Sequence, residues 1–365
     1  MEVELTEKSS FKLNPFFRVS FGPPITCELF LENKSVILPN SQYLQLLNDF
    51  KTPKPFFALI ALTTCTLNLN RTEAKEVLTD LIQQQLLVPS EKEFPKMSSV
   101  KHWVNRGWLE ALMLHLKSKD ISFDDDLVAD PDNYNAKVLA NLIDKEGTPN
   151  FWKEYPDKTN FALPKPKNPP SDKTLQDVLL QRRSNRPWCI GHLTIEQLSI
   201  ILYYANLETY FLRTEAEKNY NTNPELLLNS AFSALETYFF VFKVDGLTPG
   251  LYHYDPRKHQ VTLIKEGHFE NEVVRMCIGQ DRPKGAACTF VISSVWKRYM
   301  YRYRHARAYR TLLVNVAELA QKYILLATAL NFSNFLTPAL QDEYADELLG
   351  VNGYEEAPLY VVAIG

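Results

Sequence analysis

The sequence predicts an α+β fold for the larger, C-terminal part of the chain. Residues 236–244 are rich in aromatic and β-branched side chains, which is typical of a buried strand. Residues 308–330 carry apolar side chains at the spacing of one helix face, which predicts a long core helix. The other expected strands and helices do not alternate as regularly as they do in a parallel sheet, so we expect a mixed α+β arrangement.

The N-terminal residues 1–95 are predicted to form a separate unit. Residues 17–21 and 25–38 have the composition of short strands, and residues 56–65 and 71–87 that of two helices. This order resembles a winged-helix unit, a fold that either reads DNA or captures peptides. The second helix mixes acidic and basic side chains, which disfavours DNA reading, so we predict a winged-helix-like peptide- or partner-binding module. A purely structural role in dimer packing would leave the same pattern.

Residues 96–170 are predicted to be a helical connector that ends in a proline-rich linker. Apolar side chains recur at helical spacing over residues 103–115. The prolines of residues 163–172 fix the backbone φ angle and remove hydrogen-bond donors, which favours an extended arm. The second domain is therefore expected to span residues 171–365.

The elements of this second domain follow from local signals. Residues 175–181 predict a helix, and Thr194 and Gln197 have the spacing of a capping box before a helix at residues 198–206. Turn residues and aromatic or β-branched runs predict further strands at residues 246–255, 289–295 and 359–365.

Composition restricts the class of protein. The chain has 365 residues and a net charge of −3, so no global basic field favours a nucleic-acid partner. Its five cysteines are scattered without metal-binding spacing, and no metal is assigned to the acidic residues 124–126. No secretory signal pattern is recognisable, and no apolar run reaches the length of about 18 residues needed to cross a bilayer. We expect a cytoplasmic protein that does not insert into a membrane.

The most informative motif is the arginine cluster, which consists of Arg182, Arg183, Ser184 and Arg186. Guanidinium groups bind phosphate oxygens in a bidentate manner and stay charged at physiological pH, so the cluster suits an anionic ligand. The alternative interpretation is a solvated basic turn.

Several motifs together resemble the SagB-type dehydrogenases. These are peptide azoline oxidases of the FMN-dependent nitroreductase superfamily, whose fold is a central, mostly antiparallel sheet flanked by helices. The resemblance rests on the arginine cluster, the Gly-Leu-x-Pro-Gly-Leu-Tyr-x-Tyr turn at residues 246–254, the basic segment 304–310 and the closing segment 348–365. It covers most of residues 100–365.

The resemblance implies a cofactor, a reaction and partners. FMN is expected at the interface of a homodimer, where Arg182, Arg183, Ser184 and Arg186 would hold it and the small residues Asn229, Ser230 and Ala231 would let the backbone approach it. Members of this family oxidise thiazolines or oxazolines of ribosomally made peptides to azoles, with hydride passing to flavin and electrons to oxygen. The implied partners are a modified precursor peptide and a cyclodehydratase or another peptide-modifying enzyme.

The resemblance also implies a catalytic pair. In the azoline oxidases a Lys-Tyr pair precedes the helix that begins near residue 308, and Arg302 and Tyr303 stand at those positions here. Arginine is a poor base because it stays protonated, so Tyr303 is the predicted base and Arg302 would position or polarise the substrate. The alternative for residues 299–304 is an aromatic and basic surface that packs or binds a partner.

Two other functions remain open from the sequence alone. The chain could be a flavin-poor or catalytically silent subunit that scaffolds a peptide-modifying complex. It could also be a flavoenzyme of the same fold that acts on a different substrate, such as a nitroaromatic compound.

Overall fold

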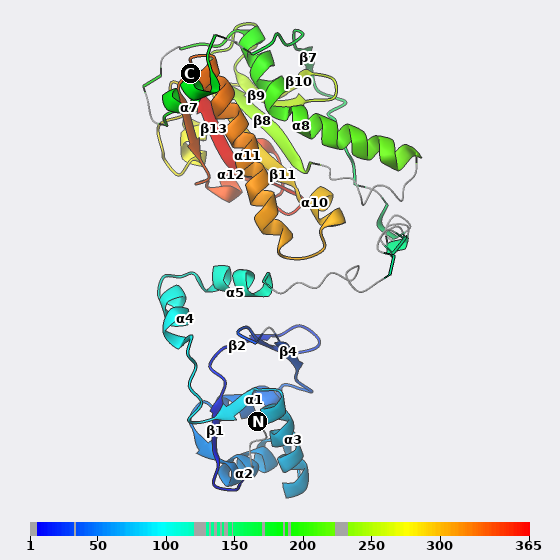
Figure 1. Cartoon of the computed structure of the whole chain (residues 1–365), viewed down its shortest axis with the longest axis vertical. Helices are drawn as coiled ribbons and strands as arrows, with labels where there is room; N and C mark the ends of the chain where they lie inside the picture. Colours follow the sequence, from blue (N-terminus) through cyan, green and yellow to red (C-terminus); the bar gives the residue numbers. More distant parts are fainter. Residues whose placement is uncertain are drawn as a thin grey trace. The chain divides into compact units, whose positions relative to one another are not determined.

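The chain divides into two compact units, Met1–Ser122 and Phe123–Gly365 (Figure 1). The structure is a computed structural model. It describes residues 6–32, 34–119, 129–130, 133–134, 137–138, 141, 145–147, 149–169, 172–184, 187–188, 191–222 and 233–365.

Two small antiparallel sheets and a set of helices form the N-terminal unit. In the first sheet, β1 (Ser10–Leu13) lies between β5 (Lys54–Pro55) and β6 (Leu87–Pro89). The second sheet has the order β2 (Phe17–Ser20), β3 (Thr26–Leu29), β4 (Lys34–Ile37). The helices are α1 (Gln42–Asp49), α2 (Phe56–Leu67), α3 (Arg71–Gln83), α4 (Met97–Val104) and α5 (Leu109–Lys117).

The structure refines the predicted elements of this unit. Residues 25–38 hold two strands, β3 and β4, which pair as a hairpin. Helix α3 begins after Asn70, whose side chain accepts hydrogen bonds from the backbone N–H of Thr72 and Glu73 at 2.9 and 3.0 Å. Just beyond the helix Gln85 has a φ of 64°, which breaks the helical path, so the apolar tail forms β6 instead of extending α3 to residue 87. The winged-helix-like assignment stays a prediction.

A seven-stranded antiparallel sheet forms the centre of the second unit. Its order is β12 (Asn334–Thr337), β13 (Glu356–Ile364), β11 (Cys288–Val295), β8 (Leu235–Val241), β9 (Gly250–Asp255), β10 (Gln260–Glu266), β7 (Asn160–Ala162). The predicted α+β class, with a mostly antiparallel sheet, is confirmed. Strand β7 precedes residue 171, the predicted start of this domain, so the sheet also takes up part of the predicted connector.

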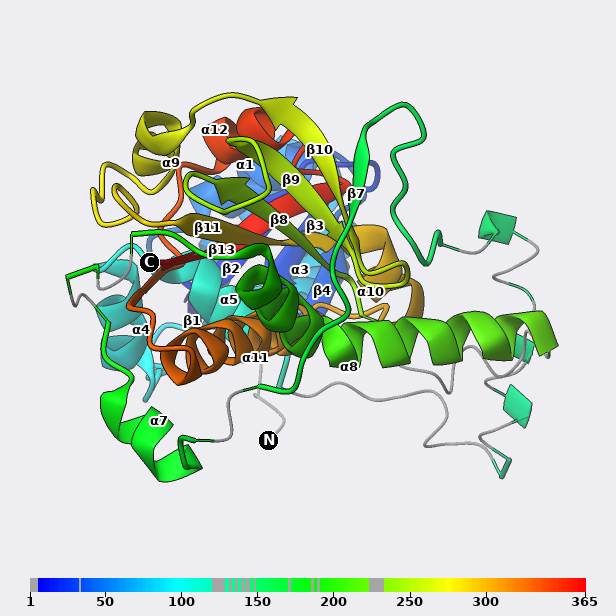
Figure 2. The ribbon, with the colours of Figure 1, turned by 90° about the horizontal axis from the view of Figure 1, so that it is seen from above.

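Helices cover both faces of this sheet (Figure 2). On one face α8 (Ile195–Thr222) and α11 (Ala308–Ala329) pack over a core that includes Phe239, Phe290 and Tyr323. On the other face α9 (Glu270–Met276) and α12 (Asp342–Leu349) pack over Tyr238 and Phe240. Successive residues of β8 point to opposite faces, so this single strand contributes to both cores.

Two smaller helices carry the residues of interest. Helix α7 (Leu175–Gln181) leads into the arginine cluster, and α10 (Trp296–Arg302) leads into Tyr303. The predicted capping box before α8 is present: Thr194 N–H donates to Gln197 Oε1 at 2.9 Å, and Gln197 N–H donates to Thr194 Oγ1 at 3.3 Å.

Helix α11 is the one helix of the described residues that is long and apolar enough, by composition, to cross a membrane. Its inner face, including Leu312, Leu319 and Ile324, is buried in the core against α8 and the sheet. This is the packing of a core helix in a folded domain.

Candidate functional site

Tyr303 lies on the wall of a cavity of about 730 Å³ at the N-terminal end of α11. The ring centroid of Tyr303 is 4.9 Å from that of Tyr299, and both residues line the cavity. Aromatic and basic side chains dominate the lining, which comprises Glu146, Trp296, Lys297, Tyr299, Met300, Tyr301, Tyr303, Arg304, His305, Ala306, Ala308, Tyr309 and Leu312. The aromatic side chains of the cavity suit a planar ring, and its basic side chains suit a ligand with electronegative groups beside that ring.

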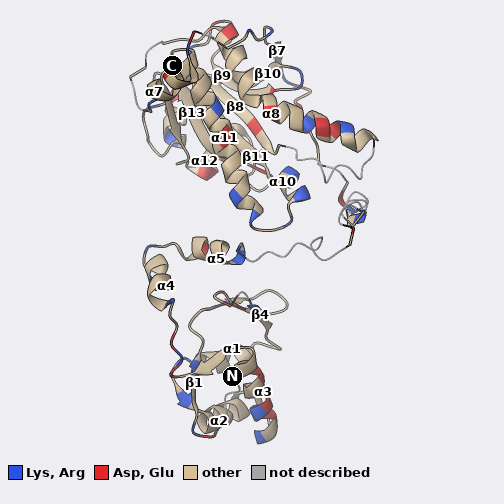
Figure 3. Ribbon diagram, in the orientation of Figure 1, with Lys and Arg blue, Asp and Glu red and all other residues tan. Residues whose placement is uncertain are grey.

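The Lys and Arg positions at this end of the domain are visible in Figure 3, where blue ribbon segments occur in α10 and at the start of α11. Arg304 forms a two-point ion pair with Glu146, at 3.1 and 3.0 Å. Hydrogen bonding to Arg304 lowers the pKa of the Glu146 carboxyl below its ordinary value. Lys297, also in the lining, leaves the cavity with an excess of cations over carboxylates.

Arg302 sits beside Tyr303 but faces elsewhere. Its guanidinium carbon is 5.2 Å from the Tyr303 ring centroid, within cation–π range. It is not part of the cavity lining, and its buried Nη1 has no hydrogen-bond partner among the described residues. Arg302 can stabilise negative charge on the Tyr303 ring without itself contacting a molecule in the cavity.

Tyr303 also lines a second, smaller cavity. This space of about 290 Å³ lies between α8 and α11 and includes Thr209, Ser233 and Asn315. Ser233 directly follows residues 223–232, which hold the predicted flavin-approaching residues Asn229, Ser230 and Ala231; these three lie outside the described residues. Ser233 and Tyr303 thus line the same cavity.

The arginine cluster follows α7 at the other end of α11. Thr174 and Asp177 form a capping box that starts α7, and hydrogen bonds from Thr174 lower the pKa of Asp177. Ser184 forms an isolated bridge with Asn334, the first residue of β12. Arg183 and Ser184 are exposed and Arg182 is half-buried, while Arg186 lies outside the described residues.

The described members of this cluster keep their donors available. In the described part of the chain, neither Arg182 nor Arg183 takes part in an ion pair; Arg183 donates only to the Arg182 carbonyl, at 3.1 Å. Two fork-shaped cations beside an exposed hydroxyl form a donor set that fits a phosphate group.

One chain does not bring the two predicted groups together. The α7 segment is tied to the C-terminal end of α11, because Lys173 Nζ donates to the Thr328 carbonyl at 3.0 Å. Tyr303 is at the N-terminal end of the same helix, beside Ala308. At 1.5 Å per residue, the 20 steps from Ala308 to Thr328 span about 30 Å. This exceeds what a single small cofactor can bridge.

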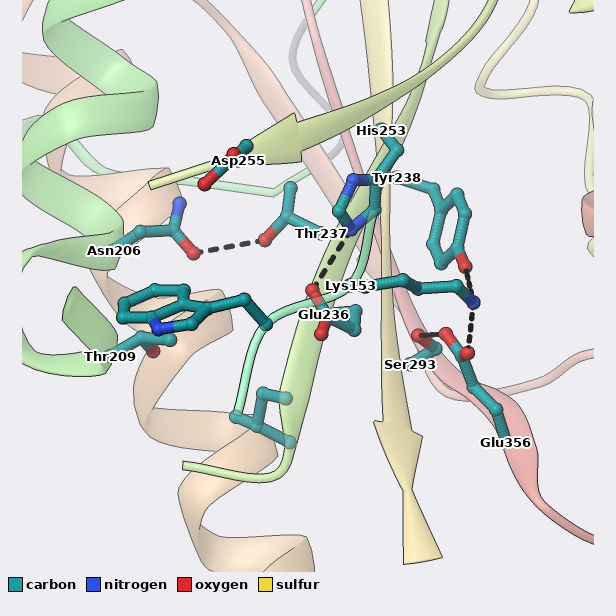
Figure 4. A network of polar contacts seen from close by, with 12 residues as sticks. Lys153, Asn206, Thr209, Glu236, Thr237, Tyr238, His253, Asp255, Ser293 and Glu356 are labelled. Atoms are coloured by element: carbon teal, nitrogen blue, oxygen red, sulfur yellow. Dashed lines mark hydrogen bonds and ion pairs between the residues drawn. The ribbon is translucent and has the colours of Figure 1, made fainter. Parts of the chain in front are cut away.

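Sequence reasoning missed a buried ionic cluster that joins Glu236 to Arg298 of α10; Figure 4 shows Glu236 with His253. Glu236 of β8 is 2% exposed, and its carboxylate accepts from Arg298, from Arg213 at 3.2 Å and from His253 Nε2 at 2.9 Å. Burial by itself raises the pKa of Glu236, but the two guanidinium groups outweigh it and hold the pKa well below its ordinary value. Glu236 is therefore a buried, charged carboxylate.

A second buried pair lies beside it. Lys153 donates to both Glu356 and the Tyr238 hydroxyl, and Ser293 Oγ donates to Glu356 Oε1 at 2.6 Å (Figure 4). Burial opposes the charge of Lys153, but attraction to Glu356 prevails and raises the Lys153 pKa. The same burial raises the pKa of Tyr238 well above its ordinary value, so this phenol stays protonated. A glutamate within the mostly apolar run 235–241 was the available sequence signal for these clusters.

Comparisons with known proteins identify the family. A sequence model described as the Nitroreductase family matches residues 225–365. The trifolitoxin operon protein TfxC of Rhizobium leguminosarum bv. trifolii is 33% identical over 322 residues, which cover 86% of this chain and 87% of that protein. The chain belongs to the nitroreductase family.

Two further members resemble parts of this nitroreductase-family chain. A protein of Methanocaldococcus jannaschii that carries the name nitroreductase is 29% identical over 191 residues, or 52% of this chain and 90% of that protein. A crystal structure of a protein named as a nitroreductase from Anabaena variabilis aligns with a TM-score of 0.45 and 27% identity, covering 57% of this chain and 42% of that one.

The family predicted from the motifs is thus confirmed. The matched region of the nitroreductase family includes Arg302 and Tyr303, and it begins after the arginine cluster. The roles of the individual residues stay predictions.

Proposed function

We propose that this protein is an FMN-dependent oxidase that converts azoline rings of a ribosomally made peptide to azoles. The observation that carries the proposal is the position of Tyr303 on the wall of an aromatic cavity large enough for a peptide ring, in a nitroreductase-family chain. The similarity to a protein of the trifolitoxin operon supports a role in peptide modification. The proposed setting is the cytoplasm, in association with a cyclodehydratase or another peptide-modifying enzyme.

The cofactor proposal rests on the donor set of the arginine cluster. Arg182, Arg183 and Arg186 would bind the FMN phosphate, with Ser184 and the small residues Asn229, Ser230 and Ala231 nearer the rest of the cofactor. When bound, FMN supplies a hydride acceptor that oxygen can reoxidise.

Tyr303 is the proposed base. In its phenolate form, the Tyr303 oxygen would take the ring proton that must leave together with the hydride for the azoline to become aromatic, and Tyr303 would become a neutral phenol. The Arg302 guanidinium, 5.2 Å from the ring centroid, would stabilise the phenolate that exists before this transfer. The Tyr299 and Tyr303 rings, which are tilted by 45° to each other, would contact the planar substrate and exclude water.

A homodimer would complete the site. Helix α11 exposes Leu313 (42%) and Val314 (54%), which line a shallow hollow of about 720 Å³ together with Ala317. Paired in an antiparallel manner about a two-fold axis through this face, two α11 helices would place the arginine cluster of one subunit near the partner subunit's Tyr303. Within one subunit the arginine cluster and Tyr303 are separated by about 30 Å along α11, whereas across the two-fold axis they would lie close together.

Residues 1–95 are proposed to bind the precursor peptide or a partner enzyme. Ile37 on strand β4 is 63% exposed, and Phe21 just after β2 is 76% exposed. β4 is an edge strand, so its outer backbone groups are available for an added peptide strand. Residues 96–170 would then connect this module to the FMN domain, residues 171–365.

Two measurements test the function. The purified protein should be yellow or take up added FMN, with a spectrum that dithionite bleaches. Incubation with an azoline-containing peptide and oxygen should remove two hydrogen atoms per ring, detected by mass spectrometry.

The outcomes separate the alternatives. A protein that cannot be loaded with FMN would contradict the oxidase and favour a scaffold subunit. A flavin-loaded protein that reduces a nitroaromatic compound and leaves azolines unchanged would favour a different substrate.

A further inference from the structure

Helix α10 depends on tertiary contacts for its position. It has only seven residues and no side-chain hydrogen bond at its N-cap, Val295. Helices this short are not stable by themselves, because their few backbone hydrogen bonds do not offset the free-energy cost of helix nucleation. Tyr299 and Tyr301 on this helix, and Tyr303 just after it, line the cavity. Whatever anchors α10 therefore sets the geometry of that cavity.

Arg298 is the anchor on the inner side of α10. Its side chain is 3% exposed and binds the Glu236 carboxylate, while its Nε donates to the Asn150 carbonyl at 2.6 Å. It is an inward-pointing charge, whereas its neighbours Lys297 and Tyr299 line the cavity. The ion pair thus ties α10 to β8 at the centre of the sheet.

Arg213 extends the same cluster to the second cavity. It binds Glu236 at 3.2 Å and donates to the carbonyls of Ser233, at 3.0 Å, and of Leu235. Ser233 and Leu235 both line the cavity between α8 and α11 that Tyr303 shares. One carboxylate therefore connects the backbone at residues 233–235 with the helix that carries Tyr303.

We propose that Glu236 is a positioning residue that, through Arg298 and Arg213, fixes α10 with Tyr303 and the backbone at residues 233–235 in a single geometry. This inference rests on the proposed function, because Tyr303 is placed there as the base. Glu236 does not line either cavity, so it acts through the two arginines.

The charge of Glu236 is essential to this role. A neutral side chain of the same shape would deprive two buried guanidinium groups of the carboxylate that contacts both, and each would favour moving toward water. Arg298 can reach water only if α10 shifts, because its side chain is enclosed. Loss of the carboxylate is therefore expected to increase the mobility of α10 before it disturbs the strands of the sheet.

The test compares Glu236→Gln, Arg298→Met and Arg298→Lys in the full chain. Amide hydrogen exchange is measured first, with and without FMN. We expect exchange at residues 299–303 to rise about tenfold or more in Glu236→Gln and Arg298→Met, while α12 is unchanged. Arg298→Lys keeps a positive charge that can reach Glu236 and should restore part of the protection.

Thr237→Val is the matched control. Thr237 is the next residue of β8, but its hydroxyl faces the opposite side and donates to Asn206 Oδ1 at 3.0 Å (Figure 4). This variant also loses a buried polar contact of the same strand, yet it should leave exchange at residues 299–303 as in the wild type.

Peptide oxidation supplies the second readout. The rate constant kcat should fall about 100-fold in Arg298→Met, as for a misplaced catalytic group, and recover in part in Arg298→Lys. Equal exchange at residues 299–303 in the wild type and Arg298→Met would overturn the inference, even if Glu236→Gln fails to fold. A wild type that oxidises no azoline would overturn the proposed function, whereas the exchange result would still show whether the cluster holds α10.

Discussion

The two ends of helix α11 differ in how the protein holds its functional groups. At the C-terminal end, Arg182 and Arg183 follow a short helix at the surface, with no ion-pair partner among the described residues. At the N-terminal end, Tyr303 follows a helix that a buried carboxylate, Glu236, anchors through Arg298. One end offers unsatisfied cations to an anionic ligand, and the other offers a preformed cavity.

Under the proposed function, this difference corresponds to separate roles for the two ends, with cofactor binding at one and proton transfer at the other. Exposed arginines without an ion-pair partner cost little free energy, because water solvates their charges until a phosphate binds. A phenol that acts as a base needs a fixed position, and the buried ion pair of Glu236 and Arg298 would provide it, although burying these charges costs free energy. Since the ends lie about 30 Å apart along α11, each would need the opposite end of a second subunit.

The largest expected effect comes from the chemical end. Tyr303→Phe removes the proposed base and keeps the ring, so flavin binding should persist while peptide oxidation falls about 100-fold or more. Rapid mixing of FMN-loaded enzyme with an azoline peptide would measure flavin reduction. Full activity in this variant would rule out Tyr303 as the base.

The binding end should respond in the opposite way. Replacing Arg182 and Arg183 together by alanine should weaken FMN binding about 100-fold, because two charge-assisted hydrogen-bond partners are lost. Fluorescence titration with FMN would measure the affinity. Lys173→Ala, which removes a nearby cation bound to the α11 carbonyl, is the control and should have a much smaller effect. Unchanged affinity in the double variant would mean that the cluster is a solvated turn.

The buried carboxylate near the N-terminal end of α11 should make folding stability depend on pH in the acidic range. Glu236 has a folded-state pKa well below the ordinary glutamate value of 4.5, so its contribution to stability is present above about pH 4.5 and is lost as the pH falls through the folded-state pKa. In Glu236→Gln the free energy of unfolding should therefore depend less steeply on pH in this acidic range, by up to about 1.4 kcal/mol per pH unit. Urea denaturation at several pH values would measure the slopes. Identical slopes would contradict a charged Glu236 in the folded state.

The smallest expected effect lies between the ends. Val314→Arg places a charge on the exposed face of α11 and should weaken a dimer formed there by about tenfold. Sedimentation equilibrium would measure the association. Ile278→Arg, at a similarly exposed apolar position outside α11 (61% against 54% for Val314), is the control and should leave association unchanged.

Much of this molecule could be predicted from local sequence patterns. The strand at residues 236–244 and the helix at residues 308–330 appear as β8 and α11 with shifts of a few residues, because their hydrophobic periodicity reflects their burial. Helix α8 runs on to Thr222, well beyond the predicted residue 206. Its later turns are polar, so periodicity gave no signal there, although Glu, Ala and Lys are good helix formers.

Contacts between distant residues could not be predicted in this way. Strand β7 has only three residues and gains its partner from β10, about a hundred positions later. Glu236 stands in a strand pattern, but its partners Arg213 and Arg298 lie on α8 and α10, so only the folded chain shows that the charge is buried and paired. The arginine cluster was predicted from its charge and the role of Tyr303 from the family resemblance, whereas their separation along α11 required the structure.

Subunit complementation tests the central claim, a site shared between the two ends of α11 in a dimer. By this account the Tyr303→Phe variant is inactive, and the Arg182→Ala/Arg183→Ala variant is inactive at an FMN concentration that saturates the wild type but lies well below the dissociation constant of the variant. Unfolded together and refolded in equal amounts with FMN, they should recover about a quarter of the wild-type oxidation rate, because half of the dimers are mixed and each has one intact site. No recovery, with mixed dimers demonstrated by mass spectrometry, would contradict a shared site.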